Sequence, residues 1–126
     1  MQIVNKVIML AMVVSDMPKA KEFYADKLGL KVVKDYRQDD DHWWVSVTFP
    51  EGGASITLTT YKENAKPGMM TLWFETSDIA AAHKELEDKD VKVNEIKDDL
   101  NGPGSGVKWF NLNDPDGNLV HVVQGK

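Results

Sequence analysis

The sequence predicts an α+β fold made of two tandem βαβββ modules. The first observation is an internal repeat: Ser15-Asp16 precedes one amphipathic segment, and Ser77-Asp78 precedes another about half a chain later. The second is that each half contains a late hairpin turn, at residues 50–53 and at residues 114–117. Both halves are therefore predicted to run strand, helix, strand, strand, strand.

Length and composition limit the possible organisation and partners. A chain of 126 residues is most simply a single domain, 1–126, here divided into modules 1–64 and 65–126. A formal net charge of −5 argues against binding to nucleic acid or to an anionic membrane, because both need a basic surface. The absence of cysteine excludes thiolate chemistry and fits a reducing cytoplasm, so we expect a cytoplasmic protein.

The first strand is predicted from the apolar run Val7–Val14. This run is too short to span a bilayer and lacks the small-residue cleavage site of a signal peptide. It ends at Ser15-Asp16, which is followed by Pro18 and an amphipathic pattern. We therefore expect a buried strand that leads into a capped helix.

Helical spacing predicts one helix near residues 18–28 and a second near residues 79–89. Apolar residues recur at the spacing of a helix face in both segments; they are Ala20, Phe23, Tyr24 and Leu28 in the first and Ile79, Ala82 and Leu86 in the second. A β-like triplet follows each helix, Leu30-Lys31-Val32 and Val91-Lys92-Val93. These triplets are the predicted second strands of the two modules.

Alternation along the first hairpin predicts two faces of different chemistry. The apolar face, which must meet the helix, holds Trp43, Val45, Val47, Phe49, Ile56 and Leu58. The other face is rich in hydroxyl groups and holds Trp44, Ser46, Thr48, Ser55, Thr57, Thr59 and Tyr61. A solvated surface would explain the hydroxyls equally well, but it explains Trp44 and Tyr61 less readily. We expect this face to line a binding cavity.

The same parity predicts the cavity-facing residues of the second module. Thr71, Trp73 and Glu75 share one face of their strand, and Leu72 and Phe74 share the other. In the last hairpin we expect Phe110 and Leu112 beside Leu119 and His121. His121 lies in the middle of a β-rich run, where an imidazole is either a hydrogen-bonded sheet residue or an acid–base group.

The ordered features of the whole chain resemble the vicinal oxygen chelate superfamily. They are the doubled βαβββ order, Ser-Asp before the first helix, Phe23-Tyr24 and Leu28-Gly29 within it, and the late Asp-Pro-Asp-Gly-Asn at 114–118. That superfamily contains glyoxalase I, extradiol dioxygenases, fosfomycin-resistance enzymes and bleomycin-binding resistance proteins. The resemblance implies a curved mixed sheet around a cleft between the modules. The fold hosts several chemistries, so it does not by itself imply an activity.

The resemblance also implies four positions at which metal-using members hold a divalent cation. Aligned on the two Ser-Asp pairs and on the last hairpin, these positions are Met9, Thr57, Thr71 and His121. One imidazole beside a thioether and two hydroxyls is a poor donor set for Zn²⁺, Ni²⁺ or Fe²⁺. We therefore expect no metal site and no cofactor.

The leading hypothesis is a glyoxalase/bleomycin resistance-like protein that binds a small, partly aromatic organic molecule in the cleft between the modules. The expected ligand-binding residues are Met9, Trp44, Ser46, Thr57, Tyr61, Thr71, Trp73, Phe110, Leu119 and His121. One alternative is a lyase, isomerase or dioxygenase of the glyoxalase family, with His121 and Glu75 as catalytic residues. Another is a regulatory or stress protein without catalysis. The resemblance also implies a homodimer, since family members commonly cover open sheet edges with a partner chain.

Overall fold

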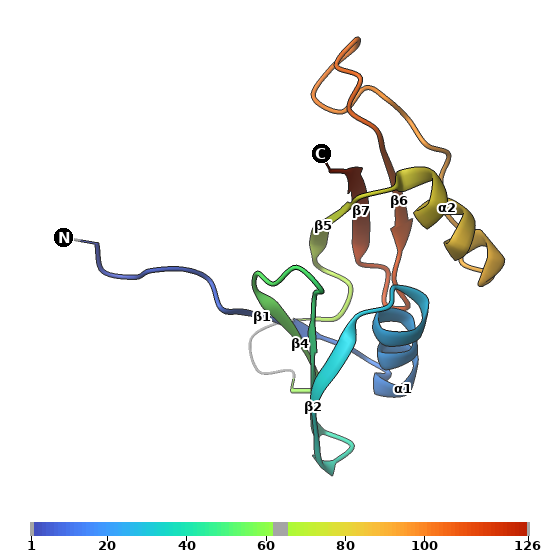
Figure 1. Cartoon of the computed structure of the whole chain (residues 1–126). Coiled ribbons are helices and arrows are strands. Elements are labelled where there is room, and N and C mark those ends of the chain that lie inside the picture. The colour runs from blue at the N-terminus through green and yellow to red at the C-terminus, as the bar shows by residue number, and fades with distance from the viewer. Residues whose placement is uncertain (1, 62–65, 126) are drawn as a thin grey trace. The chain divides into compact units, whose positions relative to one another are not determined.

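The computed structural model describes residues 2–61 and 66–125, and the chain divides into two units, Met1–Pro67 and Gly68–Lys126 (Figure 1). Each unit has its own mixed sheet and its own helix. The α+β class and the doubled βαβββ-like order predicted from the repeat are confirmed. The predicted boundary between residues 64 and 65 lies outside the described residues.

The first unit has a four-stranded sheet in the order β1-β4-β3-β2. Its strands are β1 (Met9–Val13), β2 (Lys31–Asp39), β3 (His42–Thr48) and β4 (Ser55–Thr59). Strand β1 is parallel to β4, whereas β4, β3 and β2 are antiparallel neighbours. One face of this sheet is closed by the helix, and Val45, Val47 and Leu58 on that face are fully buried.

The first helix begins where the sequence predicts. Asp16 caps it, because its side chain accepts the backbone N–H of Lys19 at 3.1 Å, and Pro18 lies in the first turn, where no N–H is needed. The α-helical part α1 (Met17–Lys21) continues into a π-helical turn, η1 (Glu22–Lys27). The Leu28 N–H reaches back five residues to the Phe23 carbonyl at 2.9 Å. The helix predicted near residues 18–28 thus spans residues 17–27, with a wider last turn.

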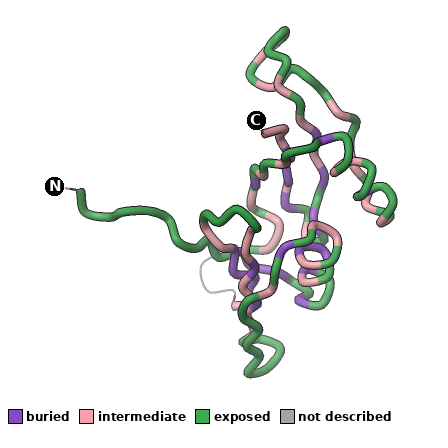
Figure 2. Tube along the Cα trace, viewed as in Figure 1, coloured by how far each residue is buried: buried purple, intermediate pink, exposed green. Residues whose placement is uncertain are grey.

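The predicted strand Val7–Val14 is shorter than expected. Strand β1 contains only Met9–Val13 of this run, and Val7 and Ile8 are 62% and 72% exposed. Strand β4 begins at Ser55, whose N–H donates to the Ile8 carbonyl, so the chain before Met9 has no described strand to pair with. The segment that precedes β1 is accordingly exposed (Figure 2).

The second unit has a three-stranded sheet in the order β5-β7-β6. Its strands are β5 (Thr71–Thr76), β6 (Trp109–Asn113) and β7 (Leu119–Gln124). Helix α2 (Ile79–Asp88) is capped by Asp78, which accepts the Ala81 N–H at 3.1 Å and so repeats the role of Asp16. Ile79 and Leu86 are its buried residues. Among the described residues, neither helical segment has the length and apolar character that crossing a membrane requires.

The predicted strand at Val91-Lys92-Val93 is wrong. After α2, the Asn94 N–H donates to the Asn111 carbonyl of β6, and Lys97 forms an isolated bridge with Trp109. The Asp99 carboxylate also accepts the Trp109 indole N–H at 3.1 Å. The segment advances by three residues from Asn94 to Lys97, whereas β6 advances by two from Asn111 to Trp109. The extra residue in the segment interrupts the regular pairing of a ladder. The described residues form seven strands where the repeat predicts eight.

A buried polar network holds the turn between β6 and β7. One Asp114 oxygen accepts the backbone N–H groups of Asp116 and Asn118, each at 2.9 Å, and the other accepts the Asn118 amide at 2.7 Å. The fully buried Asn118 also accepts the Met70 N–H at 2.8 Å, which ties the turn to the start of β5. Gly68 approaches so closely that an added Cβ would lie 2.4 Å from the Asp116 carbonyl oxygen. The Asp-Pro-Asp-Gly-Asn stretch therefore anchors the last strand that carries His121.

Candidate functional site

The face of the first sheet opposite the helix carries hydroxyl groups on neighbouring strands. The register pairs Ser46 with Thr57, Trp44 with Thr59 and Ala11 with Thr57. Directly opposed residues share a face, so these side chains lie together. The helix covers the other face, where the Tyr24 hydroxyl contacts the Met12 sulfur at 3.8 Å. The predicted separation of hydroxyl-rich and apolar faces is confirmed for this unit.

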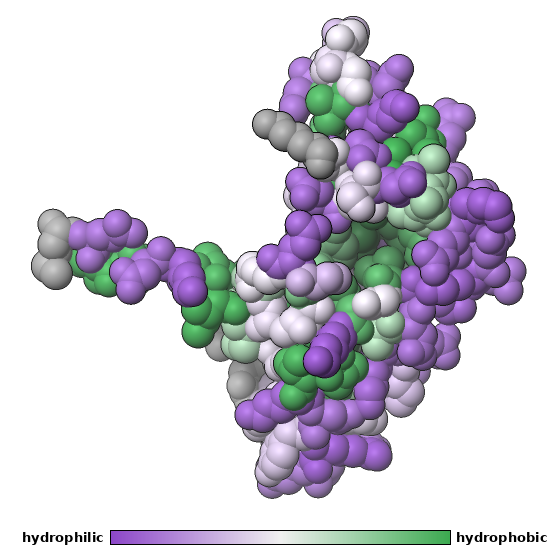
Figure 3. Space-filling model, in the orientation of Figure 1, coloured by the Kyte–Doolittle hydropathy of each residue, from purple (hydrophilic) through white to green (hydrophobic). Residues whose placement is uncertain are grey.

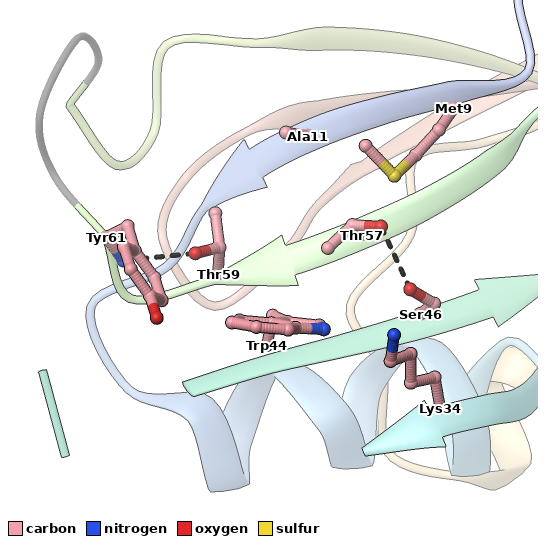
Figure 4. Close-up of a pocket in the computed structure, with 8 residues that line it drawn as sticks. All are labelled: Met9, Ala11, Lys34, Trp44, Ser46, Thr57, Thr59 and Tyr61. Atoms are coloured by element: carbon pink, nitrogen blue, oxygen red, sulfur yellow. Dashed lines mark hydrogen bonds between the residues drawn. The ribbon is translucent and has the colours of Figure 1, made fainter. Parts of the chain in front are cut away.

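A pocket of about 390 Å³ opens on the hydroxyl-rich face (Figure 4). This volume is within the range of small-molecule sites. Its lining consists of Met9, Ala11, Lys34, Trp44, Ser46, Thr57, Thr59 and Tyr61. The five first-module residues predicted to bind ligand, Met9, Trp44, Ser46, Thr57 and Tyr61, are all in this lining. Alternation alone thus brings together the predicted residues of this unit.

Aromatic rings form one wall of this pocket. The Trp44 ring centroid lies 5.7 Å from that of Tyr61 and 4.6 Å from that of Tyr36. Facing the rings, the Ser46 and Thr57 hydroxyls are hydrogen bonded to each other at 3.0 Å. Such a wall can stack on a planar ligand, while the hydroxyls can orient its polar groups.

Two residues of this lining, Ala11 and Lys34, are absent from the sequence-based prediction of this face, and alternation could not have found Lys34. Simple alternation from Lys31 places Val33 on the pocket face, but the ladder between β2 and β3 shifts between Val32 and Lys34. This β-bulge makes Lys34 the neighbour of Ser46, and its ammonium lies 5.7 Å from the Trp44 ring centroid. No turn residue or composition change in the sequence marks the bulge.

In the second unit, Trp73 and His121 are neighbours on β5 and β7. Their rings stack with centroids 3.8 Å apart and planes 17° apart, and Trp109 flanks the imidazole at 5.9 Å. Trp73 stays 56% exposed, whereas His121 is only 8% exposed. Burial lowers the pKa of His121 below its usual value, because the charged imidazolium loses hydration. The imidazole is therefore held in its neutral form at neutral pH.

The His121 Nδ1 atom is buried and has no hydrogen-bond partner among the described residues. Glu75 shares the face of His121 but is exposed and lies beside Val123 in the register, two pairs beyond the pair formed by Trp73 and His121. An acid–base imidazole usually has a partner that fixes its tautomer. No described carboxylate does this at Nδ1.

The predicted places of Thr71 and Leu119 beside this face are confirmed, since they are register partners. The predicted place of Phe110 is wrong. Phe110 pairs with Val122, and Asn111 is the residue opposite His121. The centroid of the Phe110 ring lies 5.0 Å from that of His83 on α2, and Phe110 is 1% exposed. Phe110 therefore belongs to the buried face that meets the helix. The prediction placed β6 one residue out of register with β7. A shift of one residue moves every side chain of a strand to the opposite face of the sheet.

The four positions at which the resemblance implies a divalent metal do not form a suitable donor set. They offer a thioether at Met9, hydroxyls at Thr57 and Thr71, and one buried imidazole at His121. Divalent transition metals need several imidazole, carboxylate or thiolate ligands. The described part of the chain contains no group of three or more His, Asp or Glu that could bind a metal ion. These residues do not fit the family's metal.

The chain matches one protein family and is similar to several proteins of known structure. The family model described as Glyoxalase/Bleomycin resistance protein/Dioxygenase superfamily matches residues 6–122. TnmS3, an antibiotic-binding protein from Streptomyces sp. CB03234, is 26% identical over 100% of both chains, with a TM-score of 0.84. A member of the same superfamily from Sphaerobacter thermophilus is 28% identical over 97% of this chain and 98% of the other, with a TM-score of 0.76.

A glyoxalase/bleomycin resistance protein from Streptomyces sp. CB03234 is also similar, at 26% identity over 95% of this chain and 100% of the other, with a TM-score of 0.75. No curated protein matches the sequence.

Proposed function

The chain belongs to the glyoxalase/bleomycin resistance protein/dioxygenase superfamily, and within it we propose that this protein binds a small, partly aromatic organic molecule in the pocket of its first unit. The observation that carries the proposal is the pocket of about 390 Å³, with Trp44 and Tyr61 on one side and the paired hydroxyls of Ser46 and Thr57 on the other. Its similarity to the antibiotic-binding protein TnmS3 supports an organic ligand.

We propose that binding is metal-free and stoichiometric rather than catalytic. The four family positions supply one nitrogen donor, and the Nδ1 atom of that imidazole lacks an orienting partner among the described residues. Ring stacking and hydrogen bonds can hold and orient an organic ligand without a metal. Contributions from Thr71, Trp73, Leu119 and His121 of the second unit stay predictions, as does the cytoplasmic location.

Titration of intrinsic fluorescence with a planar aromatic compound tests the proposal. Stacking on Trp44 is expected to quench indole emission saturably, and Trp44→Leu is expected to weaken binding about two- to tenfold, because a stacked ring pair contributes about 0.5 to 1.5 kcal/mol beyond burial. Trp43→Leu is the matched control, since Trp43 directly precedes Trp44 on β3 and points to the other face. Equal affinity in all three proteins would argue against this pocket.

We also propose a homodimer. Strand β1 is at the edge of its sheet, and the segment before it exposes Ile3, Val4, Val7 and Ile8, each by more than half (Figure 3). An open strand edge beside exposed aliphatic side chains favours association with a second copy. Light scattering after gel filtration should give a dimer mass at micromolar concentration, and a monodisperse monomer would contradict this proposal.

A further inference from the structure

The chemistry of the ligand can be specified further from the charges around the pocket, an inference that rests on the proposed function. On the pocket face, the register places Lys31 beside Thr48 and Lys34 beside Ser46. Only Lys34 of these two lines the pocket. The lining contains no carboxylate, so its single charged group is a cation.

The carboxylates of the same strands do not neutralise this cation. Asp35 pairs with Val45 on the opposite face, where its carboxylate binds Lys21 and accepts the Trp43 indole N–H at 2.8 Å. Asp39 lies at the far end of β2 and is hydrogen bonded to His42 at 2.9 Å. Among the residues that the structure describes, Lys34 forms no ion pair, and its ammonium lies 5.7 Å from the Trp44 ring centroid.

The position of the Lys34 ammonium suits an aromatic ligand with a negatively charged substituent on its ring. Figure 4 shows the Lys34 amine directed toward the space between Trp44 and Ser46. A ring stacked on Trp44 would therefore present a substituent to both the ammonium and the Ser46 hydroxyl. An ammonium and a hydroxyl are both donors, and a carboxylate accepts from both. Because the whole chain has a net charge of −5, this attraction must arise locally.

From this arrangement we infer that the preferred ligand is an aromatic carboxylate whose ring stacks on Trp44 and whose carboxylate pairs with Lys34. Lys34 then sets specificity, and the aromatic wall supplies affinity that does not depend on charge. The Lys34 side chain is exposed, so its replacement leaves the buried core intact.

Calorimetric titration of the full chain with 2-naphthoate and with 2-naphthamide separates these contributions, because the two compounds share a ring and nearly the same shape. We expect the wild-type protein to bind the carboxylate about three- to tenfold more tightly than the amide. Lys34→Met keeps most of the aliphatic stem, and it should reduce this ratio to about one while leaving the amide affinity unchanged. Lys34→Arg should preserve the preference.

Lys19→Met is the matched control, since it removes one positive charge from the helix on the other side of the sheet. It should keep the wild-type preference, and thermal melting should show that all variants are folded. Equal binding of both compounds to the wild type, or a carboxylate preference that survives Lys34→Met, would overturn the inference and leave the proposed function standing. Binding of neither compound would contradict the proposed function and the inference with it.

Discussion

Both units pair their first strand with their last strand in parallel, but the residues at one matching place in this pairing differ in size. In the first unit, Ala11 on β1 lies beside Thr57 on β4; at the corresponding place in the second unit, Trp73 on β5 lies beside His121 on β7. The small side chains of Ala11 and Thr57 line an open pocket, whereas the large rings of Trp73 and His121 stack on each other. The repeated backbone therefore fixes where side chains meet, and their size decides whether a ligand can enter there.

The largest expected effect comes from giving the first unit the side chain of the second. Ala11→Trp should fill the pocket and weaken binding of a planar aromatic compound by at least about a hundredfold, since the ligand and the indole cannot occupy one space. A tryptophan already occupies the matching strand position in the second unit, so we expect the sheet to accept it. Calorimetric titration measures the loss.

Ala11→Ser is the control for this substitution, because it changes the chemistry of Ala11 with little change in volume. It should bind within about threefold of the wild type. If Ala11→Trp remained folded and bound the compound normally, the pocket of the first unit would not be the ligand site.

The turns between the last two strands of the units also differ, and this difference predicts the next largest effect. The turn at residues 50–53 contains Gly52 and Gly53 at positive φ, whereas the turn at 114–118 is held by buried side chains. Asn118→Ala would remove the acceptor of the Met70 N–H and the amide group that donates to Asp114. We expect the free energy of unfolding to fall by about 1 to 3 kcal/mol.

Chemical denaturation measures this loss. Asn113→Ala is the control in the same turn, because Asn113 is exposed and donates a longer bond, 3.4 Å, to the Gly117 carbonyl. It should change stability by less than about 0.5 kcal/mol. Equal losses in the two variants would show that the buried network does not anchor the turn.

The ring stack of the second unit predicts a smaller, local effect. Trp73→Ala should expose the imidazole and raise the pKa of His121 toward its usual value, because burial is what lowers it. NMR titration of the His121 ring protons measures the shift. An unchanged His121 pKa would mean that burial by the strands alone accounts for the lowering.

The smallest effect concerns stability against pH. The folded state disfavours protonated His121, so between the lowered folded pKa and the unfolded value of about 6.5 the unfolded chain binds more protons. The stabilising contribution is complete above about pH 6.5 and is lost as the pH falls toward the folded pKa. Denaturation at about pH 7.5 and at about pH 5.5 should show a decrease in the wild type that is smaller in His121→Asn. An identical decrease in both proteins would assign it to other groups.

Much of the fold followed from the sequence because its signals are local. The two Ser-Asp caps and the helical spacing predicted the starts of both helices, and alternation predicted which residues of β3 and β4 face the pocket. These features depend on neighbours along the chain.

The errors arose where pairing between strands decides the outcome. The bulge that turns Lys34 into the pocket, the one-residue register of β6 that buries Phe110, and the interrupted ladder after α2 all depend on which residue lies opposite which. The exposed start of the apolar run Val7–Val14 has the same cause, because the pairing between β1 and β4 begins only at Met9 and Ser55. Hydrophobicity alone does not encode these choices.

The central claim is that a planar aromatic ligand occupies the pocket of the first unit, and methionine methyl NMR tests it most directly. Of the six methionines, Met9 lines the pocket, Met12 and Met17 are buried on the helix side, and Met69 is exposed in the second unit. A ring stacked on Trp44 should shift the Met9 methyl signal saturably and leave those of Met12 and Met17 nearly unchanged. Saturable binding with an unmoved Met9 signal would contradict the account.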